Sequence, residues 1–241
     1  SIVIFGHINP DGDCYGAQIG LRQAIKETYP DKKVFAVGSG FKPGLDLFLP
    51  MDEVSDEIVA NSLHIAVDFN TIERAEDKRL GTGLDMIMID HHMKQAPFGS
   101  IQLIDNDSIA ASQIIASFIM EMGFKLDVIG ASCLFMGIVT DSGRFQYQPT
   151  TPRTFEIASF LVGYGVNLQE LYDRLYVTEE SSLQFKGYVY SHYGKTEHGV
   201  IYCKLTHDVL KEFGMSGHTG AVFVNVLANV KNCPIWVFFG E

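Results

Sequence analysis

The chain has few of the features that mark several common protein classes. Its four cysteines are scattered without a C-x-x-C pair, which excludes a zinc knuckle and a disulfide framework and favours a reducing cytoplasm. No apolar run reaches the roughly 18 residues that a membrane span needs. The apolar stretch 222–230, for example, is interrupted by Asn225 and Asn229. The chain begins at Ser1 directly in an apparent strand, so we expect no signal peptide and an incomplete start with missing sequence upstream.

Positive charge is scarce as well. The 241 residues include 18 lysines and arginines against 29 aspartates and glutamates, which gives a formal net charge of −11. Such a chain lacks the broad basic face that holds a long duplex by counterion release, so we expect any nucleic-acid partner to be short. With 46% hydrophobic and 20% charged residues, the composition is that of a globular protein with one or two ordinary cores.

Short apolar segments alternate with helical patterns over most of the chain. Apolar, β-prone runs predict strands at 2–5, 33–37, 64–68 and 86–90. Helical periodicity predicts helices after residue 13 and at 110–122, 128–139, 152–161 and 168–175, with a short charged helix at 73–79. Fully apolar strands that alternate with helices are typical of an α/β fold with a parallel sheet covered by helices on both faces.

The pattern changes after residue 181. A strand is predicted at 199–205, helices at 208–213 and 221–228, and a last strand at 234–239. This indicates a second, smaller α/β domain, which we expect to be truncated because about 50 residues hardly bury a core of their own. The expected organisation is a catalytic domain at 1–180, a linker at 181–190 and a partial second domain at 191–241.

Polar side chains follow four of the predicted apolar segments, at the point where each segment ends. Each of them alone has an ordinary explanation as a turn residue or a helix cap. Together they lie where an open parallel sheet binds its ligands, at the carboxyl ends of its strands. They are His7, Asp11 and Asp13 after the first strand, Asp68 after the third, Asp90, His91 and His92 after the fourth, and Asp141 after the helix 128–139.

Six of these side chains have the chemistry of a cage for two divalent cations. Such a pair of ions requires mixed oxygen and imidazole donors with at least one bridging carboxylate. The four carboxylates of the set carry −4, which two divalent cations neutralise. Without cysteine ligands Mn²⁺ fits better than structural zinc, and Mg²⁺, Co²⁺ and Fe²⁺ are the alternatives. The six are His7, Asp11, Asp13, Asp68, His91 and Asp141.

The same four segments resemble the four motifs of the DHH phosphoesterase superfamily, in order and spacing. They are residues 7–13 (His-Ile-Asn-Pro-Asp-Gly-Asp), Asp68 after an apolar strand, residues 90–92 (Asp-His-His) and residues 140–143 (Thr-Asp-Ser-Gly). Within the superfamily the chain is most similar to the bacterial NrnA-type enzymes, which degrade very short RNA and remove the 3′-phosphate of adenosine 3′,5′-bisphosphate. The resemblance therefore implies a metal-dependent phosphoesterase whose substrate is short RNA or a mononucleotide bisphosphate.

The resemblance also implies a role for each residue. One metal ion would be held by His7 and Asp11, the other by Asp13, His91 and Asp141, and Asp68 would bridge both. His92 would lie beside the phosphoryl group, and Asp90 would orient the histidines. Arg144 follows in a Gly-Arg-Phe turn, where a phosphate contact and a solvated loop are both open. The chain departs from the family in residues 68–70 (Asp-Phe-Asn), which lack the small hydroxyl residues often found after that aspartate.

The C-terminal part matches the family less fully. In the family a smaller DHHA1 domain carries a Gly-Gly-Gly-His element that grips the nucleotide end of the substrate. Residues 190–241 resemble the beginning of that domain, but they contain no Gly-Gly-Gly-His. We expect that this element lies in sequence beyond the chain.

Three alternative functions are open. A manganese-dependent inorganic pyrophosphatase of the same superfamily usually has Asn-Pro-Asp-Thr-Asp in the first motif, where this chain has Gly12. The second alternative is a cyclic-dinucleotide phosphodiesterase, and the third is a catalytically silent nucleotide-binding module. The oligomeric state is left open by the sequence.

Other polar residues have ordinary interpretations. We expect the segment 105–108 (Asp-Asn-Asp-Ser) to cap the helix 110–122 rather than to form another metal site. The remaining histidines are interpreted as surface or capping residues, namely His64, His192, His198, His207 and His218.

Overall fold

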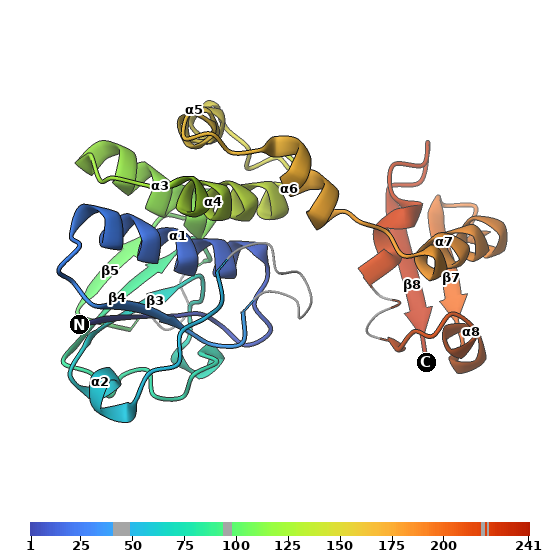
Figure 1. The fold of residues 1–241 in the computed structure, drawn as a ribbon. Coiled ribbons are helices and arrows are strands. Elements are labelled where there is room, and N and C mark those ends of the chain that lie inside the picture. Colours follow the sequence, from blue (N-terminus) through green and yellow to red (C-terminus); the bar gives the residue numbers. More distant parts are fainter. Residues whose placement is uncertain (41–48, 94–97, 218–219, 221) are drawn as a thin grey trace. The chain divides into compact units, whose positions relative to one another are not determined.

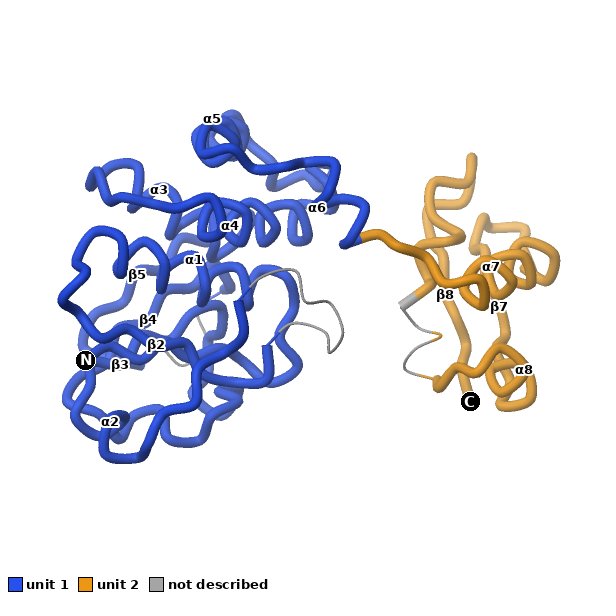
Figure 2. Tube along the Cα trace, in the orientation of Figure 1, with its two compact units in different colours: residues 1–175 blue, residues 176–241 orange. Residues whose placement is uncertain are grey.

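The computed structural model describes residues 1–40, 49–93, 98–217, 220 and 222–241. They form two compact units, residues 1–175 and residues 176–241 (Figure 2). His218 and the first residue of the helix expected at 221–228 lie outside the described residues. No helix in the described part of the chain is both long enough and apolar enough to cross a bilayer.

The first unit is built on a five-stranded sheet in which every pairing is parallel. The strand order is β2-β1-β3-β4-β5, so the connections reverse direction between β1 and β3, and open α/β sheets bind their ligands at the carboxyl ends of the strands at such a point. The predicted α/β class is confirmed. The strands are β1 (Ile2–Phe5), β2 (Val34–Val37), β3 (Leu63–Val67), β4 (Asp85–Asp90) and β5 (Ile101–Ile104).

Helices cover both faces of this sheet, as predicted. On one face lie α1 (Gly12–Thr28) and α3 (Ala111–Met122), and α4 (Val128–Asp141) packs against both of them (Figure 1). On the other face, Val59 of the short helix α2 (Asp56–Ala60) packs with Val3 and Phe5 of β1. The helices α5 (Pro152–Val162) and α6 (Leu168–Leu175) complete the unit.

The helices α1 and α4 approach each other closely because α1 presents glycine to α4. A Cβ atom at Gly12, Gly16 or Gly20 would collide with Thr140, Cys133 or Leu134 respectively. These glycines are four residues apart, so they share one side of the helix. The contacts run antiparallel, which brings the first turn of α1 beside the last turn of α4. This packing therefore joins two of the predicted motifs.

Two parts of the first unit differ from the sequence prediction. The charged segment 73–79 contains only the 3₁₀ turn η1 (Ile72–Arg74). Side-chain ion pairs hold this segment in place of a helix: Arg79 pairs with Asp77 at 2.7 Å and with Asp56 at 2.8 Å. The elements β5 and α2 were not predicted.

The second unit is a small α/β unit, as predicted. Its sheet has the order β6-β7-β8, in which β7 and β8 are parallel. The expected linker 181–190 is wrong, because these residues lie inside α7, whose Phe185 and Val189 belong to the core of the unit. The helix expected at 221–228 is the 3₁₀ segment η2. The elements are α7 (Glu180–His192), β6 (Gly194–Lys195), β7 (Val200–Leu205), α8 (His207–Glu212), η2 (Val222–Leu227) and β8 (Ile235–Gly240).

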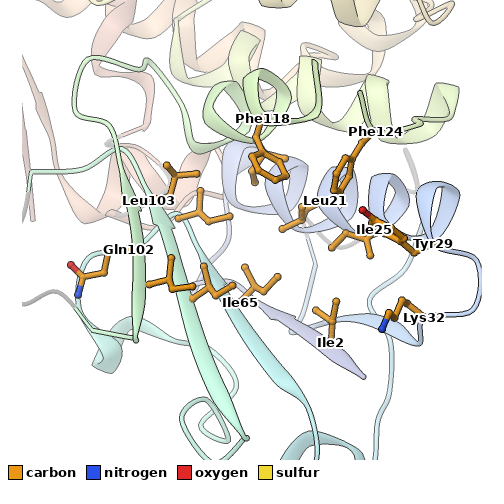
Figure 3. Close-up of a pocket in the computed structure, with 14 residues that line it drawn as sticks. Ile2, Leu21, Ile25, Tyr29, Lys32, Ile65, Gln102, Leu103, Phe118 and Phe124 are labelled. Atoms are coloured by element: carbon orange, nitrogen blue, oxygen red, sulfur yellow. The ribbon is translucent and has the colours of Figure 1, made fainter. Parts of the chain in front are cut away.

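A pocket of about 530 Å³ lies between the sheet and the helices α1 and α3 (Figure 3). Isoleucine side chains of the strands form one wall, and Leu21, Phe118 and Phe124 lie on the helix side. The polar groups of Lys32 and Gln102 stand far apart at its edges. This pocket brings no catalytic pair of side chains together, so its chemistry is that of an apolar surface.

Candidate metal centre

The predicted polar residues converge at the carboxyl end of the sheet. His7 follows β1, Asp68 follows β3 directly, His91 follows β4 and Asp141 is the last residue of α4. Asp11 is the N-cap of α1, where its carboxylate accepts hydrogen bonds from the backbone N–H groups of residues 13 (3.1 Å) and 14 (3.0 Å). The carboxyl ends of the parallel strands and the contact between α1 and α4 thus bring the separate motifs together.

Asp68 occupies the middle of the cluster. Its Oδ2 lies 3.4 Å from Nε2 of His7, and its Oδ1 lies 3.4 Å from Nε2 of His91. The backbone of Asp68 has a φ of 68°, in the left-handed region that non-glycine residues rarely adopt. This conformation directs the chain away from β3 at once and keeps the buried carboxylate between the two imidazoles.

The other carboxylates surround this pair of histidines. Nε2 of His91 lies 3.5 Å from Oδ2 of Asp141 and 3.8 Å from Oδ2 of Asp13. On the other side, Nε2 of His7 lies 3.9 Å from Oδ2 of Asp11. All six residues predicted from sequence as a metal cage are therefore brought together, with Asp68 shared by both halves.

The donor atoms fit divalent cations. Oδ1 of Asp68 and Nε2 of His91 are buried and have no hydrogen-bond partner among the described residues, although they face each other. Buried polar atoms normally have a partner, and a cation would provide one. Among the residues that the structure describes, three groups of side chains have donor atoms close enough to hold an ion. They are His7, Cys14 and Asp68; Asp68, His91 and His92; and Asp13, His91 and Asp141.

The electrostatics of the cluster indicate an excess of buried negative charge. Burial and the neighbouring carboxylates raise the pKa of Asp141 to about 9, and burial together with Asp68 raises the pKa of Asp13 to about 7. Burial alone would lower the pKa of His91, but Asp68 and the other carboxylates raise it to about 9. A bound cation relieves the same repulsion that these pKa values reflect.

Asp68 shows the opposite shift. Burial alone would raise the pKa of this carboxyl, but the imidazoles of His7 and His91 beside it lower the pKa below its ordinary value. The shift of Asp68 therefore favours the ionised form, unlike the shifts of Asp13 and Asp141.

Asp13 also caps a helix that lies far away in the sequence. Its two carboxylate oxygens accept hydrogen bonds from the backbone N–H groups of Ala111 (2.6 Å) and Ser112 (2.8 Å), at the start of α3. The prediction that the segment 105–108 caps this helix is therefore wrong. The N-cap of α3 is residue 110, which makes no side-chain hydrogen bond. The positive end of the α3 dipole stabilises the Asp13 carboxylate instead.

Asp90 and His92 form a pair beside the cluster. Oδ1 of the fully buried Asp90 lies 2.8 Å from Nδ1 of His92. Since an ionised carboxylate only accepts hydrogen bonds, Nδ1 of His92 carries the proton and Nε2 is left free. The side chain of His92 is 38% exposed, so it lies where a ligand could reach it.

Arg144 lies in a left-handed turn directly after α4. Gly143, Arg144 and Phe145 have φ values of 53°, 62° and 65°. The turn is held by Ser142, whose Oγ accepts a hydrogen bond from the N–H of Phe145 at 2.8 Å, and by Phe155, whose ring stacks on that of Phe145. A phosphate contact by Arg144 stays a prediction.

The histidines outside the cluster are of two kinds. His192, His198 and His207 are exposed, as expected of surface residues. His64 is fully buried instead, in ring contact with Phe5. Sequence reasoning missed this because His64 precedes an apolar run, which resembles a strand entrance at the surface.

The first unit thus defines a class of protein: an open parallel α/β fold with a histidine and carboxylate centre at the carboxyl ends of its strands. Residues 1–138 match the DHH family, N-terminal domain. The chain belongs to the DHH family.

Over its whole length the chain is 33% identical to "Bifunctional oligoribonuclease and PAP phosphatase NrnA" of Bacillus subtilis, of which it covers 78%. It is 35% identical to the protein of the same name from Mycoplasma pneumoniae, of which it covers 76%. A crystal structure of an exopolyphosphatase-related protein from Bacteroides fragilis matches the whole chain with a TM-score of 0.88 and 25% identity, and 76% of that protein is covered.

Proposed function

We propose that this chain is a metal-dependent phosphoesterase that hydrolyses short oligoribonucleotides and removes the 3′-phosphate of adenosine 3′,5′-bisphosphate. The observation that carries the proposal is the position of Asp68, buried between His7 and His91 with one oxygen toward each. A carboxylate in that position is what a pair of divalent cations requires as a bridge. The relatives from Bacillus subtilis and Mycoplasma pneumoniae, of which the chain covers 78% and 76%, are named for both activities.

The proposal assigns the cluster to two cations, most suitably Mn²⁺. When bound, such ions polarise the phosphoryl oxygens and lower the pKa of a water molecule at the site. Imidazole and carboxylate donors without a thiolate favour Mn²⁺, Mg²⁺ or Co²⁺ over structural zinc. One ion is assigned to His7 and Asp11, the other to Asp13, His91 and Asp141, and Asp68 is assigned to both.

The remaining residues act on the phosphoryl group and the substrate. Asp90 holds the Nδ1 proton of His92, which leaves the lone pair of Nε2 on the exposed ring to take up a proton from solvent; the protonated ring then balances charge on the phosphoryl oxygens. Arg144, in the turn after Asp141, is proposed as a phosphate contact. Residues 176–241 are proposed as part of the DHHA1 domain that binds the nucleotide end.

The proposed location is the cytoplasm. All four cysteines are free and buried in the structure, which is consistent with a reducing compartment.

A single set of assays tests the proposal. A dinucleotide RNA, adenosine 3′,5′-bisphosphate, pyrophosphate and a cyclic dinucleotide are incubated separately with the full chain, with Mn²⁺ and with EDTA. We expect hydrolysis of the first two with Mn²⁺ and none with EDTA. Turnover of pyrophosphate alone would identify a pyrophosphatase, and turnover of the cyclic dinucleotide alone a phosphodiesterase of that class. Binding of Mn²⁺ without turnover of any substrate would leave a nucleotide-binding module.

A further inference from the structure

Two asparagine side chains hold the backbone that carries the histidine pair. Nδ2 of Asn106 donates hydrogen bonds to the carbonyl oxygens of His91 (3.1 Å) and His92 (2.5 Å). Nδ2 of Asn70 donates to the next carbonyl oxygen along the chain, that of Met93, at 3.1 Å. Three consecutive carbonyl groups are thus bound by amides from two different loops. Asn70 and Asn106 are called the asparagine clamp below.

The sheet does not hold this segment. The last residue of β4 is Asp90, whose carbonyl oxygen accepts a hydrogen bond from the N–H of Asp105 at 3.1 Å. After Asp90, the carbonyl oxygens of residues 91–93 have no hydrogen-bond partner among the described residues except the asparagine clamp. An amide nitrogen carries two hydrogens, which allows Asn106 to serve two neighbouring carbonyl groups at once.

The segment must also satisfy two geometries at the same time. Nε2 of His91 lies within 3.8 Å of three carboxylates, and Nδ1 of His92 lies 2.8 Å from Asp90. The two rings belong to adjacent residues, and their centroids are 4.4 Å apart. A rotation of the peptide planes between them would move both rings, so their positions depend on how firmly the backbone of residues 91–93 is held.

The loops of the clamp belong to the same cluster. Asn70 comes two residues after Asp68, and Asn106 comes two residues after the end of β5. Asn106 also precedes the start of α3, whose N–H groups hold Asp13. The segment 105–112, which comprises the loop before α3 and the first two residues of α3, therefore contacts the histidine segment at one end and Asp13 at the other.

We infer that Asn70 and Asn106 are positioning residues: they fix the peptide planes of residues 91–93 and thereby the distances from His91 to the carboxylates and from His92 to Asp90. Neither side chain is assigned to a metal ion or to the substrate. The inference rests on the proposed function only in that His91 is taken as a metal ligand.

The experiment measures Mn²⁺ binding to the full chain by the electron paramagnetic resonance signal of free Mn²⁺. The variants are Asn106→Ala, Asn70→Ala and the double variant. Asn61→Ala is the matched control, because Asn61 is an exposed asparagine that donates to the backbone carbonyl of Glu57 in α2. We expect each clamp variant to bind Mn²⁺ about 10- to 100-fold more weakly, as is usual when the group that orients a ligand is lost. The fold-loss in Mn²⁺ affinity of the double variant should be smaller than the product of the two single fold-losses, because one substitution already frees the backbone of residues 91–93.

A charge-changing variant separates positioning from electrostatics. Asn106→Asp keeps the size of the side chain, removes both N–H donors and adds a negative charge near the centre. Charge alone predicts tighter Mn²⁺ binding, whereas loss of the clamp predicts weaker binding. In metal-free protein, long-range ¹H–¹⁵N spectra of the histidine rings provide a second readout: His92 should show a single tautomer protonated at Nδ1 in the wild type and averaged signals in Asn106→Ala.

The outcomes distinguish the two proposals. If wild-type protein neither binds Mn²⁺ nor hydrolyses either substrate, the proposed function fails. If wild-type protein does both, and folded Asn106→Ala and Asn70→Ala match Asn61→Ala in Mn²⁺ affinity and in the His92 spectrum, the asparagine clamp is rejected while the function stands. Far-ultraviolet circular dichroism of each metal-free variant establishes that it is folded. If Asn106→Ala does not fold, Asn106→Asp and Asn70→Ala decide the matter.

Discussion

Asp68 is the residue on which both halves of the candidate centre depend. Replacing it with asparagine keeps its shape but removes the negative charge that lies 3.4 Å from each histidine. We expect Asp68→Asn to lower kcat/KM for adenosine 3′,5′-bisphosphate by about three orders of magnitude, or ~4 kcal/mol in transition-state stabilisation, and to reduce the number of bound Mn²⁺ ions. Steady-state kinetics and a Mn²⁺ titration measure the two effects.

The control for this variant is Asp107→Asn, which removes an exposed carboxylate in the loop after β5. It should retain turnover, since no hydrogen bond or ion pair among the described residues joins the Asp107 side chain to the cluster. Near-normal turnover of Asp68→Asn at saturating Mn²⁺ would contradict the bridging assignment.

His64 supplies a pH dependence that is separate from the metal centre. Its Nδ1 accepts a hydrogen bond from the N–H of Gly81 at 3.1 Å, so its Nε2 must carry the proton and donates to the carbonyl oxygen of Val59 at 2.9 Å. The ring is therefore neutral in the folded protein, and burial lowers its pKa. Below an ordinary histidine pKa of about 6.5 the unfolded chain binds a proton that the folded chain does not, so stability falls as the pH falls.

We expect that lowering the pH from 7 to 5 reduces the free energy of unfolding of the wild type relative to that of His64→Gln, because the groups of the metal centre titrate in both proteins and cancel in the comparison. That variant should be ~1–2 kcal/mol less stable at pH 7, because a buried hydrogen bond is lost. Urea unfolding in the presence of EDTA at both pH values measures the slopes. Equal slopes in wild type and variant would show that His64 is not the group that titrates.

At the scale of elements, the close contact of α1 and α4 sets the distance between the first and last motifs. A methyl group on Gly16 would collide with the backbone carbonyl of Cys133, so the two helices must separate. We expect Gly16→Ala to lower the free energy of unfolding by ~1–3 kcal/mol, the usual cost of overpacking. It should also weaken Mn²⁺ binding, because Asp13 moves away from Asp141.

The matched control is Gly187→Ala in α7, where an added Cβ meets no atom within 4 Å. Replacing a helical glycine with alanine in open space stabilises by up to ~1 kcal/mol. Circular dichroism unfolding and a Mn²⁺ titration of both variants give the comparison. Tight Mn²⁺ binding by Gly16→Ala would mean that the helix spacing does not control the centre.

The elements also explain which features the sequence could predict. The first, third and fourth strands were predictable because each is an apolar run that ends in a charged or imidazole side chain, and parallel strands place those ends together. The edge strand β5 was not, because Ile101 and Leu103 alternate with polar neighbours and are exposed. The segment 181–190 resembles a linker in sequence, because α7 buries only Phe185 and Val189 and so has a weak apolar pattern.

Contacts between loops that are distant in the sequence could not be predicted from local sequence patterns. The cap of α3 is Asp13, 98 residues before Ala111, whereas capping rules inspect only the residues that directly precede a helix. The clamp residue Asn106 lies in the segment expected to be that cap, and its contacts are to His91 and His92 instead. Such pairings depend on strand order, which the hydrophobic pattern does not specify.

For the whole molecule, the division into two units has a consequence for metal binding. All six predicted metal ligands and both clamp residues lie in residues 1–175. The only tryptophan of the chain, Trp236, lies in β8 of the second unit. Tryptophan fluorescence therefore follows the second unit alone, while circular dichroism follows the helices of both.

We expect Mn²⁺ to stabilise the first unit and to leave the second unchanged. A ligand at 100 times its dissociation constant adds ~2.7 kcal/mol to the stability of the unit that binds it. The effect should be marked here, because the ions also neutralise the buried carboxylates whose repulsion raises the pKa of Asp141. Heating with Mn²⁺ or with EDTA, monitored by both signals, should show a higher Tm in circular dichroism and the same Tm in Trp236 fluorescence. An equal shift in both signals would mean that the two units unfold together, and no shift in either would mean that the centre does not bind Mn²⁺.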